Sequence, residues 1–377
     1  MSSRSGNVAS IIIVILVFSA VGGYVFITNQ YVPSNIAVVV LDPGRGDSSI
    51  VDQAYQGLFM IDVVVNYDYR RANNTDHAQD ILEDIASRGR HDLIIVIGSD
   101  PDLHTAVQTV AEAHQNQKFA LIGGSVPLDN VASATFAHKE AAFLAGSLAA
   151  HVSVGNPDLN GIVGIIAAVA TDPTLTEIID GFLQGLRYAN ETIANATHQI
   201  TLLPTEYVGS FNDTTTAETI ATDMYNPYVG NASVIFAPVR ASLLGIRAAM
   251  EWANLSYHAM FGNETTREPF VVGAEFDQGY LGNPNIEIAS GPSWVIGSII
   301  PRSDLAIYRI INASLWDEFP GGLENGSVNQ TIGDLENEGI DLGGLEEFRN
   351  DVWVTDPMLN VTATIREMII NGTIVIT

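Results

Sequence analysis

The sequence contains no cysteine and only two lysines, Lys118 and Lys139, among its 377 residues. Without cysteine, disulfide bonds, thiolate metal sites and a lipid-bearing cysteine are excluded. Acidic residues outnumber basic ones so strongly that the formal net charge is −27. Nucleic-acid binding needs clustered cations that neutralise phosphates, so no nucleic-acid partner is expected.

Motifs for catalysis are also missing. The eight histidines are scattered without a His-x-x-x-His pair, and neither a Gly-x-Ser-x-Gly motif nor a Walker loop is present. Carboxylates are abundant, but their number in so acidic a chain says little about acid–base pairs. We therefore expect a protein that is not an enzyme, with no cofactor and no metal site.

An uncharged apolar run covers residues 8–28, and Arg4 is the only charged side chain before it. A run of about twenty such residues can span the hydrocarbon core of a bilayer. The preceding cation predicts that the N-terminus stays inside and that the rest of the chain is extracellular. We expect residues 1–30 to form a single-pass transmembrane anchor in the cell membrane. The alternative is a cleaved signal peptide, for which Ser19–Ala20 is a weak cleavage site.

Asn-x-Ser/Thr sequons are unusually frequent, as expected of an exported chain that carries surface glycans. Eleven of the twelve follow residue 189, so the later half should carry most of any glycan. The candidate acceptors are Asn73, Asn190, Asn195, Asn212, Asn231, Asn254, Asn263, Asn312, Asn325, Asn329, Asn360 and Asn371.

Short apolar, β-branched runs alternate with helical segments through the body, residues 31–377. This alternation predicts an α/β protein with doubly wound parallel sheets. The first series places strands at residues 36–41, 61–65, 92–97, 119–122 and 131–136, and the second at 161–166, 200–208, 233–236, 270–275 and 293–300. Two series of similar size predict two lobes. Residues 320–345, rich in Gly, Asn and acidic residues, are expected to be irregular.

Polar and glycine-rich loops follow several of these predicted strands. They cover residues 42–47, 98–100, 123–125 and 275–277. In open α/β sheets, ligands bind just beyond the carboxyl ends of the strands, where helix N-termini also meet. Each loop alone is ordinary turn chemistry, but four of them on two lobes favour a ligand-binding cleft.

Several segments follow one another in the order of a known family pattern. They are the opening run from Asn35 to Val40, Asp47-Ser-Ser, and residues 92–98, 118–122, 130–136, 181–185, 207–213 and 368–376. The run Tyr207-Val-Gly-Ser-Phe-Asn-Asp213 is the most specific. Together these segments resemble the BMP ("basic membrane protein") family of substrate-binding proteins, which serve ABC importers and include purine-nucleoside receptors.

This resemblance implies a periplasmic-binding-protein-like fold of type I, with two Rossmann-like lobes joined by a three-strand hinge. We expect the first lobe to contain about residues 35–137 plus 270–300. The second lobe would then contain about 138–269 plus 301–377. The transmembrane helix would precede both lobes.

The resemblance also marks ligand positions, several of which differ from the family pattern. Ile50 and Val51 stand where the family has Phe-Asn, and Gly123 or Gly124 replaces an aspartate. Glu275 stands at a ribose-binding aspartate, and Arg240 lies in a loop that is usually glycine-rich. Because a stacking aromatic is lost, purine nucleosides should bind poorly. The predicted ligand-binding residues are Asp47, Ser49, Ile50, Val51, Ser99, Gly124, Arg240 and Glu275.

The leading functional hypothesis is a membrane-anchored extracellular protein that delivers a small polar solute to ABC permease subunits. Arg240 could supply a cation to an anionic ligand, or could form a surface salt bridge. The rival hypothesis is a surface sensor or structural protein that keeps the binding-protein fold without transport.

Overall fold

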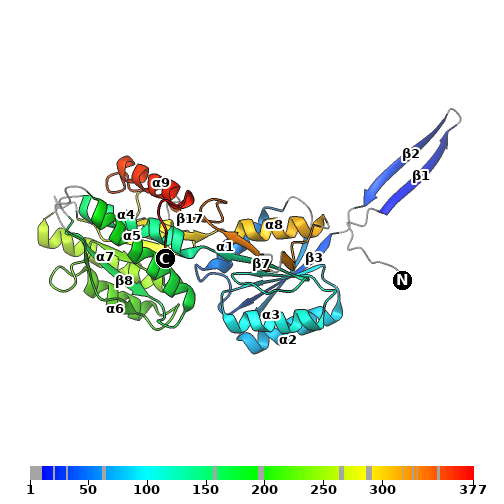
Figure 1. Ribbon diagram of the computed structural model, residues 1–377, viewed down its shortest axis with the longest axis horizontal. Coiled ribbons are helices and arrows are strands. Elements are labelled where there is room, and N and C mark those ends of the chain that lie inside the picture. The colour runs from blue at the N-terminus through cyan, green and yellow to red at the C-terminus, as the bar shows by residue number, and fades with distance from the viewer. Residues whose placement is uncertain are drawn as a thin grey trace. The chain divides into compact units, whose positions relative to one another are not determined.

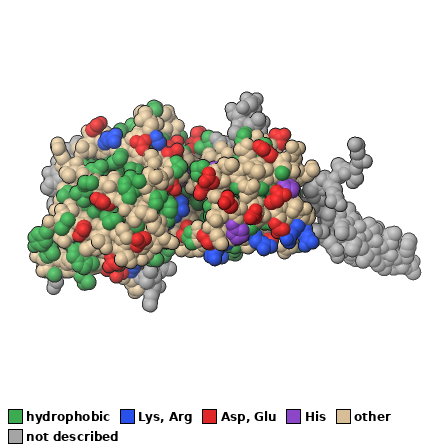
Figure 2. All heavy atoms as spheres, turned by 90° about the horizontal axis from the view of Figure 1, so that it is seen from below, with side chains coloured by type: hydrophobic (Ala, Val, Ile, Leu, Met, Phe, Trp, Pro, Cys, Tyr) green, Lys and Arg blue, Asp and Glu red, His purple; other side chains and the backbone are tan. Residues whose placement is uncertain are grey.

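The computed structural model describes residues 11–19, 22–30, 33–61, 65–155, 159–193, 199–262, 267–285, 291–316, 318–324, 327–328, 330–345 and 349–377. These residues divide into two compact units. Unit 1 contains residues 1–44, 54–135 and 303–331, and unit 2 contains residues 45–53, 136–302 and 332–377. Acidic side chains are scattered over the visible face in Figure 2 and do not gather in one patch.

The sheet of unit 1 has the strand order β16-β7-β6-β5-β3-β4. The pairs from β7 to β4 are all parallel. The strands are β3 (Ser34–Leu41), β4 (Val65–Ala72), β5 (Leu93–Ile97), β6 (Phe119–Ile122), β7 (Val131–Phe136) and β16 (Gln330–Gly333). Every residue of β5 and β6 is buried, as expected of central parallel strands covered on both faces.

Helices cover both faces of this sheet (Figure 1). They are α1 (Ile50–Phe59), α2 (Thr75–Arg88), α3 (Pro101–Ala113) and α8 (Ser303–Leu315). Leu82 and Ile85 of α2 and Val107 and Val110 of α3 share one apolar cluster with alternate residues of β3 and β5. Asn74 and Asp100 accept hydrogen bonds from the first turns of α2 and α3, which fixes where these helices begin.

The sheet of unit 2 has the strand order β10-β8-β11-β12-β13-β17, with β9 also paired to β8. The strands of this sheet pair in parallel, except that β13 pairs with β17 antiparallel. The strands are β8 (Ile162–Ala167), β9 (Thr201–Leu202), β10 (Glu206–Tyr207), β11 (Val234–Phe236), β12 (Phe270–Ala274), β13 (Val295–Pro301) and β17 (Ile340–Gly343).

In unit 2, the helices α4 (His138–Gly155), α5 (Pro173–Thr192) and α9 (Asp356–Ile370) lie on one face of the sheet. The helices α6 (Thr214–Tyr225) and α7 (Leu243–Phe261) lie on the other (Figure 1). Glycines bring α4 and α5 into backbone contact. A Cβ added at Gly185 would lie 1.9 Å from the Phe143 carbonyl oxygen, and one at Gly146 would lie 2.0 Å from that of Phe182. No side chain fits between the two helices at these points.

The structure corrects the predicted division into lobes. Residues 270–300 were expected in the first lobe, but β12 and β13 are hydrogen-bonded members of the unit 2 sheet. Residues 303–315, which form α8, belong to unit 1 instead of the second lobe. Strand pairing between distant segments decides this assignment, and a local hydrophobic pattern does not report it.

Two local predictions were also wrong, and a third lies mostly outside the described residues. Of the strand expected at residues 61–65, residues 62–64 lie outside the described part, and the described strand β4 begins at Val65. The strand expected at 200–208 consists of two short strands, β9 and β10. Residues 320–345 are not irregular throughout, since they contain the hairpin strands β14 (Leu323–Glu324) and β15 (Ser327–Val328) as well as β16 and β17.

The apolar N-terminal run forms two antiparallel strands, β1 (Ile11–Ser19) and β2 (Gly22–Gln30), in place of the expected transmembrane helix over residues 8–28. Isoleucine and valine dominate β1, and β-branched residues favour extended backbone. Among the described residues, no helix has both the length and the apolar character that a membrane span requires.

Eight of the twelve sequon asparagines lie in the described part of the chain. Asn73, Asn190, Asn212, Asn360 and Asn371 are exposed, whereas Asn231, Asn254 and Asn312 are partly buried. The acceptors Asn195, Asn263, Asn325 and Asn329 lie outside the described residues. Glycosylation of the later sequons stays a prediction.

Candidate functional site

The carboxyl ends of neighbouring strands in unit 2 bring two charged residues together. Strands β11 and β12 pair in parallel, from Val234 with Phe270 to Phe236 with Val272. Glu275 directly follows β12, and Arg240 opens the short 3-10 turn (Arg240–Ser242) that leads into α7. Because parallel strands end at the same edge of a sheet, the two side chains meet there.

Arg240 and Glu275 form a bidentate ion pair. The Arg240 Nε donates to Glu275 Oε2 at 2.7 Å, and an Nη donates to Oε1 at 2.8 Å. The Arg240 side chain is 18% exposed and that of Glu275 only 3%. The guanidinium also lies over the Phe211 ring, with its carbon 4.0 Å from the ring centroid. Two parallel hydrogen bonds and a stacked ring hold the guanidinium in one orientation.

Both residues of this pair have left-handed backbone conformations, which non-glycine residues rarely adopt. The φ angle is 50° at Arg240 and 70° at Glu275. Such conformations cost on the order of 1–3 kcal/mol each and persist only where surrounding contacts enforce them. The ion pair and the stacking on Phe211 are contacts of that kind, so the site carries local strain.

The predicted residues just before and at the start of α1 also belong to unit 2. Asp47, Ser49, Ile50 and Val51 are all buried. Asp47 accepts a hydrogen bond from the Ser49 amide at 3.2 Å, and the Ser49 hydroxyl accepts one from Val51. Asp52 accepts hydrogen bonds from the amides of Gly46 and Ser48, both at 2.8 Å, and thereby fixes the loop. Asp47 is thus a buried carboxylate held at the start of a helix.

The charges at this site act on one another. Desolvation opposes the Arg240 charge, but the charge and hydrogen bonds of Glu275, with Asp47 and Asp172, outweigh it and raise the pKa of Arg240. Burial raises the pKa of the Asp47 carboxyl, hydrogen bonding by Ser49 and the Arg240 charge oppose this rise, and the Glu275 charge adds to it. The single positive charge of Arg240 therefore interacts with three carboxylates, those of Glu275, Asp47 and Asp172.

His138, the first residue of α4, is a further member of the site that the sequence did not reveal. Desolvation lowers its pKa to about 4, and the Glu275 charge acts weakly in the opposite direction. Its Nδ1 is buried and has no hydrogen-bond partner among the described residues. The imidazole is therefore neutral at pH 7.

The two remaining predicted residues, Ser99 and Gly124, lie in unit 1. Ser99 follows β5 and Gly124 follows β6, so both lie at the carboxyl edge of the unit 1 sheet. The His104 Nε2 lies 3.0 Å from the Gly98 carbonyl oxygen. A Cβ added at Gly124 would meet the same imidazole at 2.3 Å. His104 thus packs directly against this pair of loops, and the sequence did not single it out.

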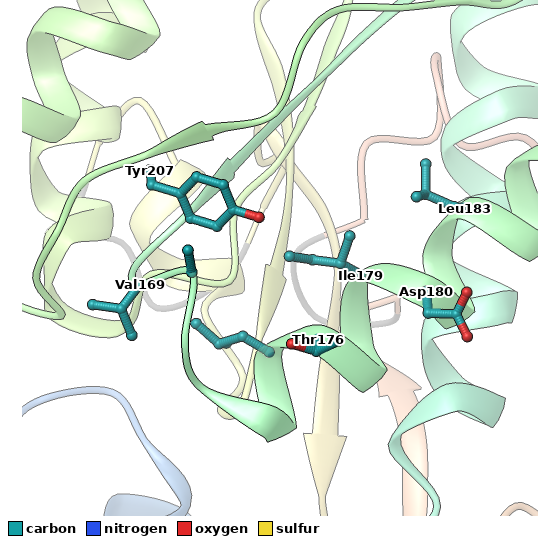
Figure 3. Close-up of a pocket in the computed structure, with 8 residues that line it drawn as sticks. Val169, Thr176, Ile179, Asp180, Leu183 and Tyr207 are labelled. Carbon is teal, nitrogen blue, oxygen red and sulfur yellow. The ribbon is translucent and has the colours of Figure 1, made fainter.

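Unit 2 also has a small surface pocket of about 190 Å³ beside the first turns of α5 (Figure 3). Its lining is mainly apolar and includes Val169, Leu175, Ile179, Leu183 and Tyr207, with Asp180. None of the eight predicted site residues lines it. Sites for small ligands usually enclose roughly 300–1,000 Å³, so this pocket is too small for most solutes.

Comparison with known proteins identifies the family. Residues 34–373 match the family model described as ABC transporter substrate-binding protein PnrA-like, the Bmp family. The chain belongs to this family. It is 25% identical over 315 residues to the ABC transporter nucleoside-binding protein BmpA of Lactococcus lactis, covering 81% of each chain. It is 24% identical over 353 residues to an uncharacterised lipoprotein of Pyrococcus abyssi, covering 91% of this chain and 78% of that one.

Solved structures agree on the fold. An ABC transporter solute-binding protein from Aeropyrum pernix superposes with a TM-score of 0.72 at 21% identity, covering 92% of this chain and 94% of that one. A second, from Conexibacter woesei, gives 0.65 at 16% identity, covering 91% and 98%. The periplasmic-binding-protein-like fold is therefore confirmed. The family itself is one of ABC transporter substrate-binding proteins.

The sequence correctly placed Arg240 and Glu275 at strand ends but missed what completes their site. Phe211 lies in the specific run 207–213, which could have drawn attention to it. Asp172 was recognisable as a residue before a helix with proline at its start. His138 gave no signal, because a single histidine after a strand is common.

We expect a double-mutant cycle to show strong coupling between Arg240 and Glu275. Arg240→Met leaves a buried carboxylate without its partner and should cost about 3–5 kcal/mol in the free energy of unfolding. The double variant Arg240→Met/Glu275→Gln should lose clearly less than the sum of the two single losses. Urea unfolding followed by circular dichroism measures all four proteins. Additive losses would show that the pair is not coupled.

His138 should make the protein less stable in acid. Its pKa is about 4 in the fold against 6.5 for an unperturbed histidine, so between these values the unfolded chain binds the extra proton. Stability contributed by neutral His138 is complete above pH 6.5 and falls towards pH 4, by about 3 kcal/mol at most. Urea unfolding from pH 7 to 4 should therefore show a smaller loss for His138→Gln than for the wild type. Parallel pH profiles for the two proteins would contradict this.

Proposed function

We propose that the protein binds a small, uncharged, hydroxyl-bearing solute and delivers it to ABC permease subunits. The observation that carries the proposal is the buried polar set of unit 2, in which Asp47 lies near the fixed Arg240–Glu275 pair. An ionised carboxylate offers about four acceptor positions, and Asp47 uses one of them for the Ser49 amide. The remaining acceptor capacity suits solute hydroxyl groups.

The residues around Asp47, Arg240 and Glu275 indicate which class of solute the site favours. The Lactococcus relative is named a nucleoside-binding protein. In this chain, Ile50 stands where the resemblance implies a stacking aromatic, and it is buried. Arg240 lies over the Phe211 ring. An aliphatic side chain and a covered ring favour sugars or polyols over purine nucleosides.

A solute screen with a matched control tests this function. Pentoses, hexoses, polyols, inosine and adenosine are added to the purified protein, and a bound solute raises the melting temperature by mass action. For the best solute, Asp47→Asn should weaken binding about tenfold, because a charge-assisted hydrogen bond contributes roughly 1.5–3 kcal/mol.

The matched control is Asp180→Asn, since Asp180 also lies in unit 2 but pairs with Lys139. It should bind the solute as the wild type does. Micromolar binding of inosine or adenosine that is unchanged in Asp47→Asn would refute both the solute class and the role of Asp47.

We further propose that the protein works at the outer face of the cell membrane and is attached through its apolar residues 8–28. The run is uncharged, and the sequence offers no cysteine for a lipid. The full chain should remain in the membrane pellet after a high-salt wash, which removes proteins held only by charge. Immunoblotting of the wash and the pellet measures this. Release of the intact chain into the wash would overturn the attachment.

A further inference from the structure

The charged residues around Arg240 determine whether the site can accept a solute that is itself charged. Arg240 is a cation of the candidate site, and one edge of its guanidinium, formed by Nε and one Nη, is used in the ion pair with Glu275. One face of the guanidinium is covered by Phe211. Asp47 and Asp172 also act on it as negative charges. The cation that could have attracted an anionic solute is thus already compensated within the protein.

We propose that Glu275 serves as a built-in counter-ion, so that the site rejects anionic solutes and admits neutral ones. The proposal rests on the proposed function above and names its charge selectivity. Glu275 is nearly fully buried and holds Arg240 by two short hydrogen bonds, so an incoming anion would have to displace a well-placed carboxylate. It would also meet the negative charges of Asp47 and Asp172, which already act on Arg240.

The geometry predicts a gain of binding when the counter-ion is removed. Glu275→Gln keeps the size of the side chain and one acceptor oxygen but removes the charge. Arg240 then presents a guanidinium whose donors suit a planar or tetrahedral oxyanion. The protein's own carboxylate would be replaced by an external anion in the same place.

Strand β12 offers a matched control at its opposite end. Glu268 precedes β12 and Glu275 follows it, so the two residues flank the same strand. Glu268 accepts a hydrogen bond from Asn350, away from Arg240. Glu268→Gln changes the net charge of the protein by the same amount as Glu275→Gln. Any effect of the overall acidity on anion binding is therefore equal in the two variants.

The test uses inorganic phosphate as the probe, in HEPES buffer with ionic strength held constant by potassium chloride. Melting temperature and isothermal titration report binding to the wild type, Glu275→Gln, Glu268→Gln and Asp47→Asn. Glu275→Gln should bind phosphate at least about tenfold more tightly than the wild type and Glu268→Gln. Asp47→Asn, which keeps the ion pair, should show a smaller gain.

Two results would overturn the proposal. One is wild-type binding of phosphate as tight as that of Glu275→Gln. The other is a folded Glu275→Gln, judged by circular dichroism, with no gain over Glu268→Gln. If Glu275→Gln does not fold, equal phosphate binding by Asp47→Asn and the wild type overturns it. Failure of the proposed function gives a different result: no neutral solute in the screen raises the melting temperature.

Discussion

The ion pair between Arg240 and Glu275 depends on the parallel register of β11 and β12, and much of the unit 2 site depends in turn on that pair. The register brings the two strand ends to one edge of the sheet. The bidentate hydrogen bonds then hold two residues in left-handed conformations. Fixing the Arg240 backbone also fixes the start of α7, since the turn Arg240–Ser242 leads directly into that helix.

A buried ion pair is weak evidence for stability, because desolvation of both ions offsets much of their attraction. Here the ion pair has a clearer role in fixing the orientation of the side chains at the site. It orients a guanidinium over Phe211 and keeps Glu275 almost fully buried. Polar groups that are already oriented lose little freedom when a solute binds. The strain at both residues is thus consistent with a site that is preorganised.

The sequence predicted the central strands well because they are buried on both faces and read as continuous apolar runs, as in β3 and β5. It did not predict that β4 continues from Val65 to Ala72, because most residues of this edge strand are polar. It could not assign β12 and β13 to the correct unit, because a buried strand reads the same in either sheet. Within the site, strand ends predicted the positions of Arg240 and Glu275. Their mutual pairing was not predictable, because it depends on side-chain geometry between segments 35 residues apart.

The glycine contact between α4 and α5 restricts the substitutions that are possible at positions outside the site. The two helices touch through their backbones at Gly146 and Gly185. The first residue of α4 is His138, and the residue that caps α5 is Asp172, so both helices begin at members of the site. A larger residue at Gly185 would force the helices apart and move these two groups relative to Arg240. The range of acceptable mutations is therefore narrow at positions that never touch a solute, and solute specificity is constrained by helix packing as well as by the residues that line the site.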